Sequence, residues 1–352
     1  MSPLSRTHPL VRRLALATTA LALVTTAACG GDDASDAKPP TTGDAEWDAV
    51  VEAAYEEGRV NVYNAASEQQ NKRLTEAFKE KYPGIKLSIT RGATELPERV
   101  SAQLNSGSDG ADVLMYSDPN WFVEHADDLT PVEGPSVEGW KEDWWAVPDK
   151  AIQVTALPWS MIVWNTDKFP DGFTTYDDLL DPSVKGKLGT RSEVSPSVAG
   201  YLEHLETELG TDYLEGIADQ DPKFYPSGVP LMQAVGSGEI GVANLGVPAT
   251  IAELQSNGAP IDFTFAEPGF AYTHGAAAFS EAKRPHAGRV FIDFVMSEEG
   301  QAAYNGDGQG GAGRDGVDGA LDLEDYAMLD TEKFTRPEVL AEWNRKFDGY
   351  FK

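Results

Sequence analysis

The sequence predicts an α/β protein built as two lobes that are joined by a hinge. From about residue 46 to residue 116, short apolar runs alternate with segments of helical periodicity, a pattern typical of a parallel sheet covered by helices. Further along, two extended stretches, 151–164 and 262–279, flank a second unit of the same kind. A chain that crosses twice between two such units is expected to form two lobes around a hinge.

The first unit begins with a helix near residues 46–57, where Trp47, Val51 and Ala54 recur at helical spacing before Gly58. The elements expected to follow, in chain order, are a strand at 59–63, a helix at 68–82, a strand at 85–90, a helix at 96–105 and a strand at 112–116. In a parallel sheet, ligands bind at the carboxyl ends of the strands, where the next helices begin.

The second unit and the return of the chain follow the same logic. The expected elements are helices near 175–180 and 196–208, a strand at 241–245, and helices at 248–256, 287–296 and 298–304. We therefore predict a first lobe from residues 46–156 plus 272–352 and a second lobe from residues 157–271.

Residues 1–28 have the composition of a secretory signal. Three arginines precede an uncharged run from Leu14 to Ala28, which is shorter than the roughly 20 residues of a membrane span. Thr26-Ala27-Ala28-Cys29 resembles a bacterial lipobox, which predicts that Cys29 becomes a lipid-bearing N-terminus. Residues 29–45 then form a flexible tether. The alternative is ordinary cleavage that leaves a free thiol.

The excess of acidic residues argues against binding partners that are themselves negatively charged. Lys and Arg number 28 and Asp and Glu number 57, for a net charge of −29, so nucleic acid and anionic lipid surfaces are repelled. A single cysteine leaves no internal disulfide. We expect no nucleic-acid partner, and membrane contact only through the lipid anchor.

Several short motifs occur in a characteristic order. They are Gly58-Arg59-Val60-Asn61-Val62-Tyr63, the segment Phe78 to Ile85, Ala111-Asp112-Val113-Leu114, Trp164-Asn165-Thr166, the segment Tyr176 to Lys187, Phe291 to Val295, and Ser297 to Gln301. Together they resemble the extracellular solute-binding proteins of bacterial ABC importers, in the branch that includes ferric-ion-binding proteins.

The resemblance implies a two-lobe periplasmic-binding-protein-like (type II) fold that closes over one solute. It implies no catalysis and no cofactor, and a partner permease in the membrane. We expect a monomer on the outer face of the cell membrane. One alternative is a receptor that signals instead of transporting, which would share all of these features. The other alternative is an extracellular enzyme on the same fold, which would need a nucleophile and a base in the cleft. The sequence offers no such pair, so no catalytic residue is predicted.

The resemblance also frames the choice of ligand. Ferric members usually hold iron with two adjacent tyrosines near a helix start in the second lobe, whereas the matching segment here, 243–248, contains no tyrosine. Those members often carry a His where this chain has Asn64-Ala65-Ala66-Ser67. Ferric iron needs anionic oxygen ligands. We therefore predict no metal site and a small anionic organic solute, with ferric iron or an amine as the alternatives.

Candidate ligand-binding residues lie where helices begin and in the extended stretches. Hydroxyl residues at helix starts bind anions, although capping alone is their commonest role, and arginines pair with phosphate, phosphonate or carboxylate. Aromatic side chains could stack on a ring or an amine. The predicted set is Ser67, Arg91, Thr94, Asp118, Trp121, Trp159, Arg191, Ser195, Ser197, Asn244 and Tyr272.

Overall fold

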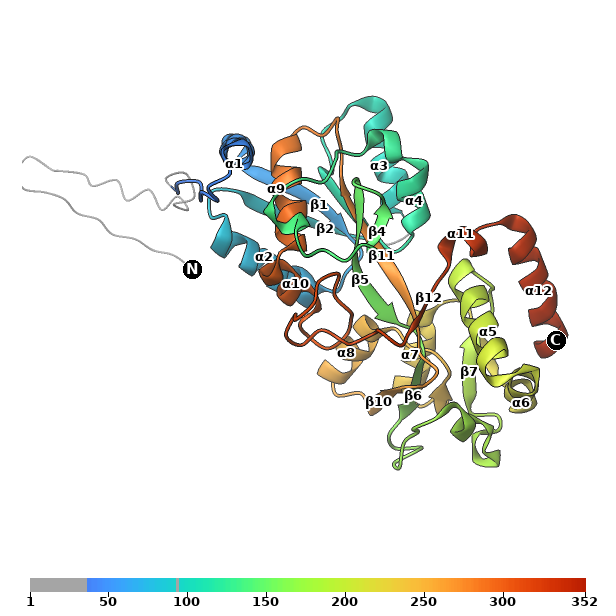
Figure 1. The fold of residues 1–352 in the computed structure, drawn as a ribbon. Coiled ribbons are helices and arrows are strands. Elements are labelled where there is room, and N and C mark those ends of the chain that lie inside the picture. Colours follow the sequence, from blue (N-terminus) through green and yellow to red (C-terminus); the bar gives the residue numbers. More distant parts are fainter. Residues whose placement is uncertain (1–36, 93–94) are drawn as a thin grey trace, which may run out of the picture. The chain divides into compact units, whose positions relative to one another are not determined.

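The computed structural model describes residues 37–92 and 95–352, and two β-sheets with helices packed on them make up this part of the chain (Figure 1). The predicted α/β class is confirmed. The predicted signal, Cys29 and Thr94 lie outside the described residues, as does most of the predicted tether.

Seven strands form the first sheet, in the order β2-β1-β3-β11-β5-β4, and β12 pairs with β11. The strands are β1 Arg59–Asn64, β2 Lys86–Arg91, β3 Val113–Tyr116, β4 Trp145–Val147, β5 Ala151–Pro158, β11 Phe270–Ala278 and β12 Ala327–Met328. Because β1 is parallel to both β2 and β3, the carboxyl ends of all three strands lie at one edge, where the next helices begin.

Helices cover the first sheet, and local signals set their ends. The helices are α1 Ala45–Glu57, α2 Glu68–Lys81, α3 Leu96–Ser106, α4 Pro119–Glu124, α9 Pro285–Met296 and α10 Glu298–Asn305. The Asp44 side chain accepts from the first N–H groups of α1, and Gly58 ends that helix with φ of 69°, which favours glycine. Phe78 of α2 packs on the rings of Phe291 and Phe294 from α9.

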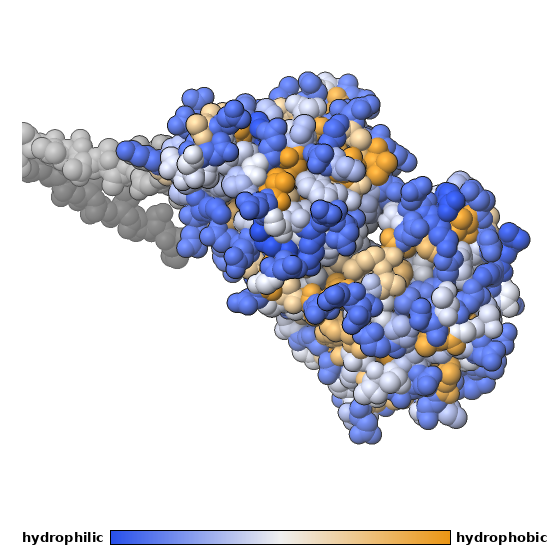
Figure 2. Space-filling model, in the orientation of Figure 1, coloured by the Kyte–Doolittle hydropathy of each residue, from blue (hydrophilic) through white to orange (hydrophobic). Residues whose placement is uncertain are grey.

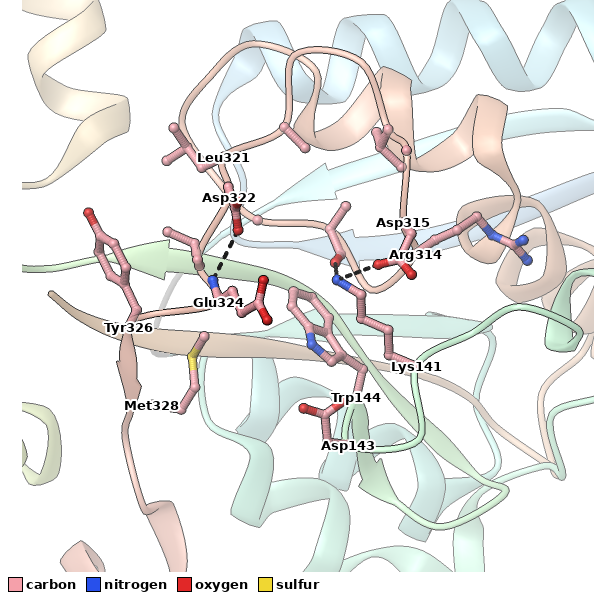
Figure 3. Close-up of a pocket in the computed structure, with 16 residues that line it drawn as sticks. Lys141, Asp143, Trp144, Arg314, Asp315, Leu321, Asp322, Glu324, Tyr326 and Met328 are labelled. Carbon is pink, nitrogen blue, oxygen red and sulfur yellow. Dashed lines mark hydrogen bonds and ion pairs between the residues drawn. The ribbon is translucent and has the colours of Figure 1, made fainter.

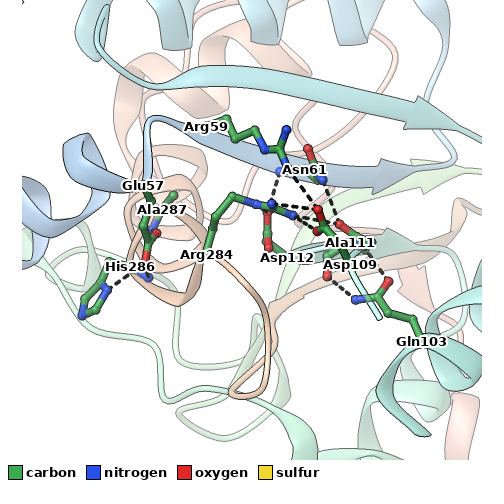
Figure 4. Close-up of polar contacts among 11 residues, drawn as sticks. Glu57, Arg59, Asn61, Gln103, Asp109, Ala111, Asp112, Arg284, His286 and Ala287 are labelled. Carbon is green, nitrogen blue, oxygen red and sulfur yellow. Dashed lines mark hydrogen bonds and ion pairs between the residues drawn. The ribbon is translucent and has the colours of Figure 1, made fainter. Parts of the chain in front are cut away.

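A polar network lies at the edge of the first sheet that is opposite the starts of α2 and α3 (Figure 4). Arg284, just before α9, donates from Nε to Asp112 Oδ2 over 2.7 Å and also pairs with Asp109. Asn61 of β1 donates its backbone N–H to the same Asp112 oxygen over 2.7 Å. The network therefore fixes the segment that enters β3 against β1 and α9, far along the sheet from the helix starts.

Five strands form the second sheet, in the order β10-β6-β9-β7-β8. Its strands are β6 Met161–Asn165, β7 Leu188–Arg191, β8 Lys223–Tyr225, β9 Val242–Ala243 and β10 Ile261–Phe265, and its helices are α5 Pro196–Leu209, α6 Thr211–Asp219, α7 Gly228–Gly236 and α8 Pro248–Ser256. β7 runs parallel to β8 and β9, so α5, α7 and α8 begin near one edge. The predicted helix near 175–180 is a short 3₁₀ turn at Tyr176–Leu180.

Two crossings connect the sheets, as the extended stretches predicted. Each extended stretch forms two strands joined by a short connection: β5 leads to β6 through Trp159 and Ser160, and β10 leads to β11 through residues 266–269. Hydrogen bonds of Ser160 link the two crossings. Its backbone oxygen accepts from Ala266 N over 2.8 Å, and its Oγ accepts from Phe270 N over 2.9 Å. Ser160 thus joins the two crossings.

The C-terminal helices pack on the second core. α11 Thr331–Phe334 and α12 Pro337–Phe351 place Phe334, Trp343 and Phe347 in the same buried cluster as α5 and α6. Here the structure differs from the predicted boundaries, which put all of 272–352 in the first lobe. The sequence shows no sharp break before this segment, and only the apolar side of α12 decides which core it covers.

Hydrophilic residues cover most of the face in Figure 2.

Candidate functional site

Two adjoining cavities lie between the start of α2 and the start of α8. Their volumes are about 100 Å³ and about 260 Å³, and they share Ser67, Ala249 and Gln309. The smaller cavity is also lined by Ala65, Ala66, Gln70, Thr155, Leu157, Val247, Pro248, Tyr272, His274 and Tyr304. The larger adds Glu68, Gln69, Arg91, Ala252, Glu253, Ser256 and Asn257. The cavities are thus bounded by elements of both sheets.

Ser67 caps α2 and sets how this helix faces the cavities. Its Oγ accepts from the Gln70 N–H over 3.2 Å, and the Gln70 side chain accepts from the Ser67 N–H in return, which is a capping box. The N–H groups of Glu68 and Gln69 donate to no acceptor in the described part of the chain. The first turn of a 14-residue helix therefore presents free donors and the positive end of its dipole.

α8 begins on the other side of the same cavities without a side-chain cap. Val247 occupies the cap position, Pro248 follows it, and within residues 37–92 and 95–352 nothing accepts from the N–H of Ala249. Proline suits this position because the first helical N–H has no partner within the helix. Two helix N-termini with free donors thus line one cavity system, an arrangement suited to an anionic group.

Strands β5 and β11 form the floor of the smaller cavity. Tyr272 pairs with Leu157 and His274 pairs with Thr155, so alternate residues of both strands face the cavity. His274 is 7% exposed, and its Nδ1 has no hydrogen-bond partner. Burial lowers the pKa of His274 to about 4 and raises the pKa of Tyr272 to about 12. Both side chains are therefore neutral near pH 7.

Arg91 brings a positive charge to the larger cavity. It ends β2, and its Nε donates to the backbone oxygen of Ala66 over 3.1 Å, which holds the side chain beside the start of α2. The exposed carboxylates of Glu68 and Glu253 line the same cavity. No carboxylate lines the smaller cavity, so no negative side chain opposes an anion there.

The predicted residues of the second sheet lie at the carboxyl ends of β7 and β9. Ser195 Oγ accepts from the Val198 N–H at the start of α5 and lies 3.3 Å from Ser197 Oγ. Arg191 Nε and Asn244 Oδ1 are buried without a hydrogen-bond partner. Burial also lowers the pKa of Arg191. None of these residues lines either cavity.

Three other predicted residues serve the core or a helix start. Trp121 is buried and stacks on His125 with ring centroids 4.0 Å apart. Trp159 is buried between Tyr201 and Tyr272. Asp118 caps α4 by accepting from Asn120 N over 3.0 Å. None of the three lines the cavities, so the structure gives no support to ligand stacking by the two tryptophans.

Five residues outside the predicted set also line the smaller cavity: Gln70, Thr155, His274, Tyr304 and Gln309. The sequence places His274 beside the proposed cleft, because it stands two positions after Tyr272 in one extended stretch and so points to the same face. Tyr304 and Gln309 come from the end of the chain, and no local pattern shows that α10 and the loop after it reach the start of α2.

A further finding concerns membranes and metals. No helix among residues 37–92 and 95–352 is both long and apolar enough to cross a bilayer. In the same part of the chain, no group of three or more His, Cys, Asp or Glu side chains is arranged to hold a metal ion.

The two-sheet fold, the paired crossings and a cavity between helix starts define a class: binding proteins that hold a solute between two α/β lobes. Comparison with known families agrees. Residues 38–302 match the family of bacterial extracellular solute-binding proteins, and the chain belongs to that family. No curated protein matches the sequence.

Solved structures show the same fold at low identity. Iron-bound HitA from Pseudomonas aeruginosa has a TM-score of 0.61 at 21% identity, covering 82% of this chain and 98% of that one. AfuA from Actinobacillus pleuropneumoniae, with fructose-6-phosphate bound, has a TM-score of 0.58 at 18% identity, covering 84% and 99%. The substrate-binding protein of an ABC transporter from Agrobacterium tumefaciens has a TM-score of 0.63 at 16% identity, covering 84% and 94%. The predicted family and the two-lobe type II fold are thereby confirmed.

Proposed function

We propose that this solute-binding protein captures a small anionic organic solute, with the anionic group held between the starts of α2 and α8. One observation carries the proposal: the free N–H groups of Glu68, Gln69 and Ala249 line a single cavity system. Their helix dipoles add to the attraction for negative charge, and Arg91 stands beside them.

The lining of the smaller cavity supports the proposal that the solute is organic. Leu157 and Pro248 are apolar, while Tyr272, Tyr304 and His274 present neutral rings. Such a lining favours a compound that carries a small carbon framework next to its charged group, such as a phosphate ester, a phosphonate or a carboxylate. A bare oxyanion would leave this surface without a complement.

Ferric iron is the alternative within the same family, and the chemistry of the cavity is less suited to it. Ferric iron is a hard cation that prefers anionic oxygen ligands. Burial raises the pKa of Tyr272 to about 12, which makes the phenolate that ferric iron would require harder to form. The free donors at both helix starts would repel a cation.

The transport role follows from family membership and is part of the proposal. Loaded protein would dock on an ABC permease, acting as a monomer on the outer face of the cell membrane, anchored through Cys29. We expect Cys29→Ser to release the protein from the membrane fraction of its host. Retention of this variant on membranes would contradict lipid anchoring through Cys29.

Native and denaturing mass spectrometry of protein purified from its host tests the ligand class. An organic anion released on unfolding supports the proposal, and stoichiometric iron would refute it. An empty protein would be screened by thermal shift against phosphate esters, phosphonates, carboxylates and amines. Stabilisation by amines alone would also refute it.

A matched pair of variants tests the helix start itself. Glu68→Pro removes one free N–H, and proline is well tolerated because position 68 opens α2 after an extended Ser67. Glu68→Ala removes only the carboxylate. We expect Glu68→Pro to weaken binding of the identified anion about tenfold relative to Glu68→Ala, as loss of a charge-assisted hydrogen bond predicts. Equal affinities would place the anion elsewhere.

A further inference from the structure

A second hollow lies away from the solute cavities, beside β12. It combines cavities of about 680 Å³ and about 580 Å³ that share Asp143, Trp144 and Met328. Neither cavity shares a residue with the two between α2 and α8. We call this hollow the β12 groove; Figure 3 shows its larger part, with the Trp144 ring as a wall between Lys141 and Met328.

The free edge of β12 lies in this groove. Ala327 N donates to Gly269 O over 3.0 Å and Leu329 N donates to Ala271 O over 2.9 Å, so both donors point to β11. Alternate residues of a strand bond in opposite directions, so the N–H and C=O of Met328 point away from β11. β12 has no other strand partner in the described residues, and its outer edge is open to pairing.

Trp144 supplies a second unpartnered donor. The residue is 8% exposed, and its backbone oxygen accepts from the indole N–H of Trp140 over 3.1 Å, whereas its own indole N–H donates to nothing within the described ranges. Figure 3 shows the ring nitrogen on the side of the ring that faces Met328 and Asp143. The Trp144 Nε1 atom is not among the buried unpartnered side-chain atoms, so its N–H opens to the groove, where a peptide carbonyl is a suitable acceptor.

The charges around the groove are unbalanced. Lys141 pairs with Asp315 at 3.2 Å, and the Arg314 guanidinium donates to the backbone oxygens of Met296, Ser136 and Glu138. The carboxylates of Asp143, Glu324 and Glu332 have no cationic partner in the part of the chain that the structure describes. The groove therefore keeps a net negative potential next to an exposed apolar side chain, Met328.

We propose that the β12 groove binds an extended, basic peptide segment of a partner protein, which adds as a strand to the free edge of β12. The segment's carbonyls accept from Met328 N–H and Trp144 Nε1, its alternate basic side chains pair with Asp143 and Glu324, and its apolar side chains cover Met328. A metal ion or a simple amine would satisfy the carboxylates but would leave both N–H donors unpaired.

Fluorescence anisotropy of labelled peptides with the full chain tests this interface. The probe is Lys-Val-Lys-Val-Lys-Val-Lys, and the matched control is Lys-Pro-Lys-Pro-Lys-Pro-Lys, which has the same charge but lacks every second N–H. We expect the valine peptide to bind at least several-fold more tightly than the proline peptide. Equal affinity would mean that charge alone attracts both, and no binding of the valine peptide would also overturn the proposal.

Paired protein variants separate the groove from the general negative charge. Asp143→Asn combined with Glu324→Gln should lower the affinity for the valine peptide roughly fivefold, because each exposed ion pair contributes modestly to binding. Glu52→Gln combined with Glu56→Gln, at exposed positions of α1, makes the same change in net charge and should have no effect. Equal weakening by both pairs would refute the assignment.

Hydrogen exchange gives an independent readout. Bound valine peptide should slow exchange in the segment around Met328, because pairing protects its amide. Binding without protection there would place the peptide elsewhere and overturn strand addition to β12.

Discussion

Replacement of Arg284 by methionine is expected to destabilise the protein while leaving solute affinity unchanged. Arg284 and Asp112 are 6% and 1% exposed, and Arg284 Nε donates to Asp112 Oδ2 over 2.7 Å. Asp112 Oδ1 has no hydrogen bond, and the Asn61 N–H is the other donor to Oδ2. The variant would leave a buried carboxylate with one donor and no counter-charge.

The expected magnitude follows from this geometry. Removal of one partner of a buried ion pair costs about 3–5 kcal/mol. At about 2–4 °C for each kcal/mol in a chain of this order of size, the melting temperature should fall by roughly 6–20 °C. The contact between Arg284 and Asp109 adds little, because Asp109 is half exposed and solvent screens the pair.

The effect should depend on pH in a defined direction. Burial raises the pKa of Asp112, and loss of the guanidinium raises it further. A carboxyl whose pKa is higher in the folded protein than in the unfolded chain favours folding as pH falls. The stability gap between wild type and Arg284→Met should therefore narrow as the pH is lowered from about 7 toward about 5.

Urea unfolding followed by tryptophan fluorescence measures the free energy of unfolding, and Asp112→Asn in the Arg284→Met background is the control. We expect the second change to recover most of the lost stability, because it removes the buried charge. A loss below about 1 kcal/mol, or no recovery in the double variant, would refute the reasoning. Calorimetric titration of the folded variant should give wild-type solute affinity, since the network lies at the edge opposite the helix starts.

Three further predictions concern the cleft. Arg91→Ala should weaken solute binding about tenfold through loss of an anion partner, whereas Arg345→Ala, at an exposed position, should not; unchanged affinity in a calorimetric titration of the first would contradict its role. Ser67→Ala should lower the free energy of unfolding by about 1 kcal/mol through loss of the cap on α2, and Ser67→Asp should retain it, which urea unfolding can check. The pKa of His274 is lowered to about 4 from 6.5, so its contribution to stability is complete above about pH 6.5 and is lost as pH falls toward 4. His274→Gln should flatten the pH dependence of the melting temperature in this range, and an unaltered profile would show that His274 does not titrate as described.

Much of the first sheet could be predicted because its signals are local. Alternating burial in β1, the Ser67 capping box and the stop at Pro83-Gly84 all operate within a few residues. The same holds for the two crossings, whose apolar sequences lack helical period. Short elements of the second unit, such as β8 and α7, escaped prediction because three to nine residues carry too little periodicity.

Chain topology dictates where three of the predicted residues lie, and their roles in ligand binding remain predictions. Ser67, Arg91 and Tyr272 line the cavities because helix starts, strand ends and hinge strands lie at one edge of an α/β sheet. Trp121 and Trp159 are buried instead, because whether a tryptophan faces a cleft or a core depends on neighbours such as His125 and Tyr201 that lie on other elements.

The sequence by itself determined the α/β class, the order of the elements in the first unit and the helix starts that face the two cavities, because capping, periodicity and strand alternation act over short distances. Only the tertiary structure decided that α8 opposes α2, that His274 and Tyr304 complete the floor, and that α12 covers the second core. These arrangements depend on packing between segments separated by up to hundreds of residues, and no local pattern encodes which surfaces meet.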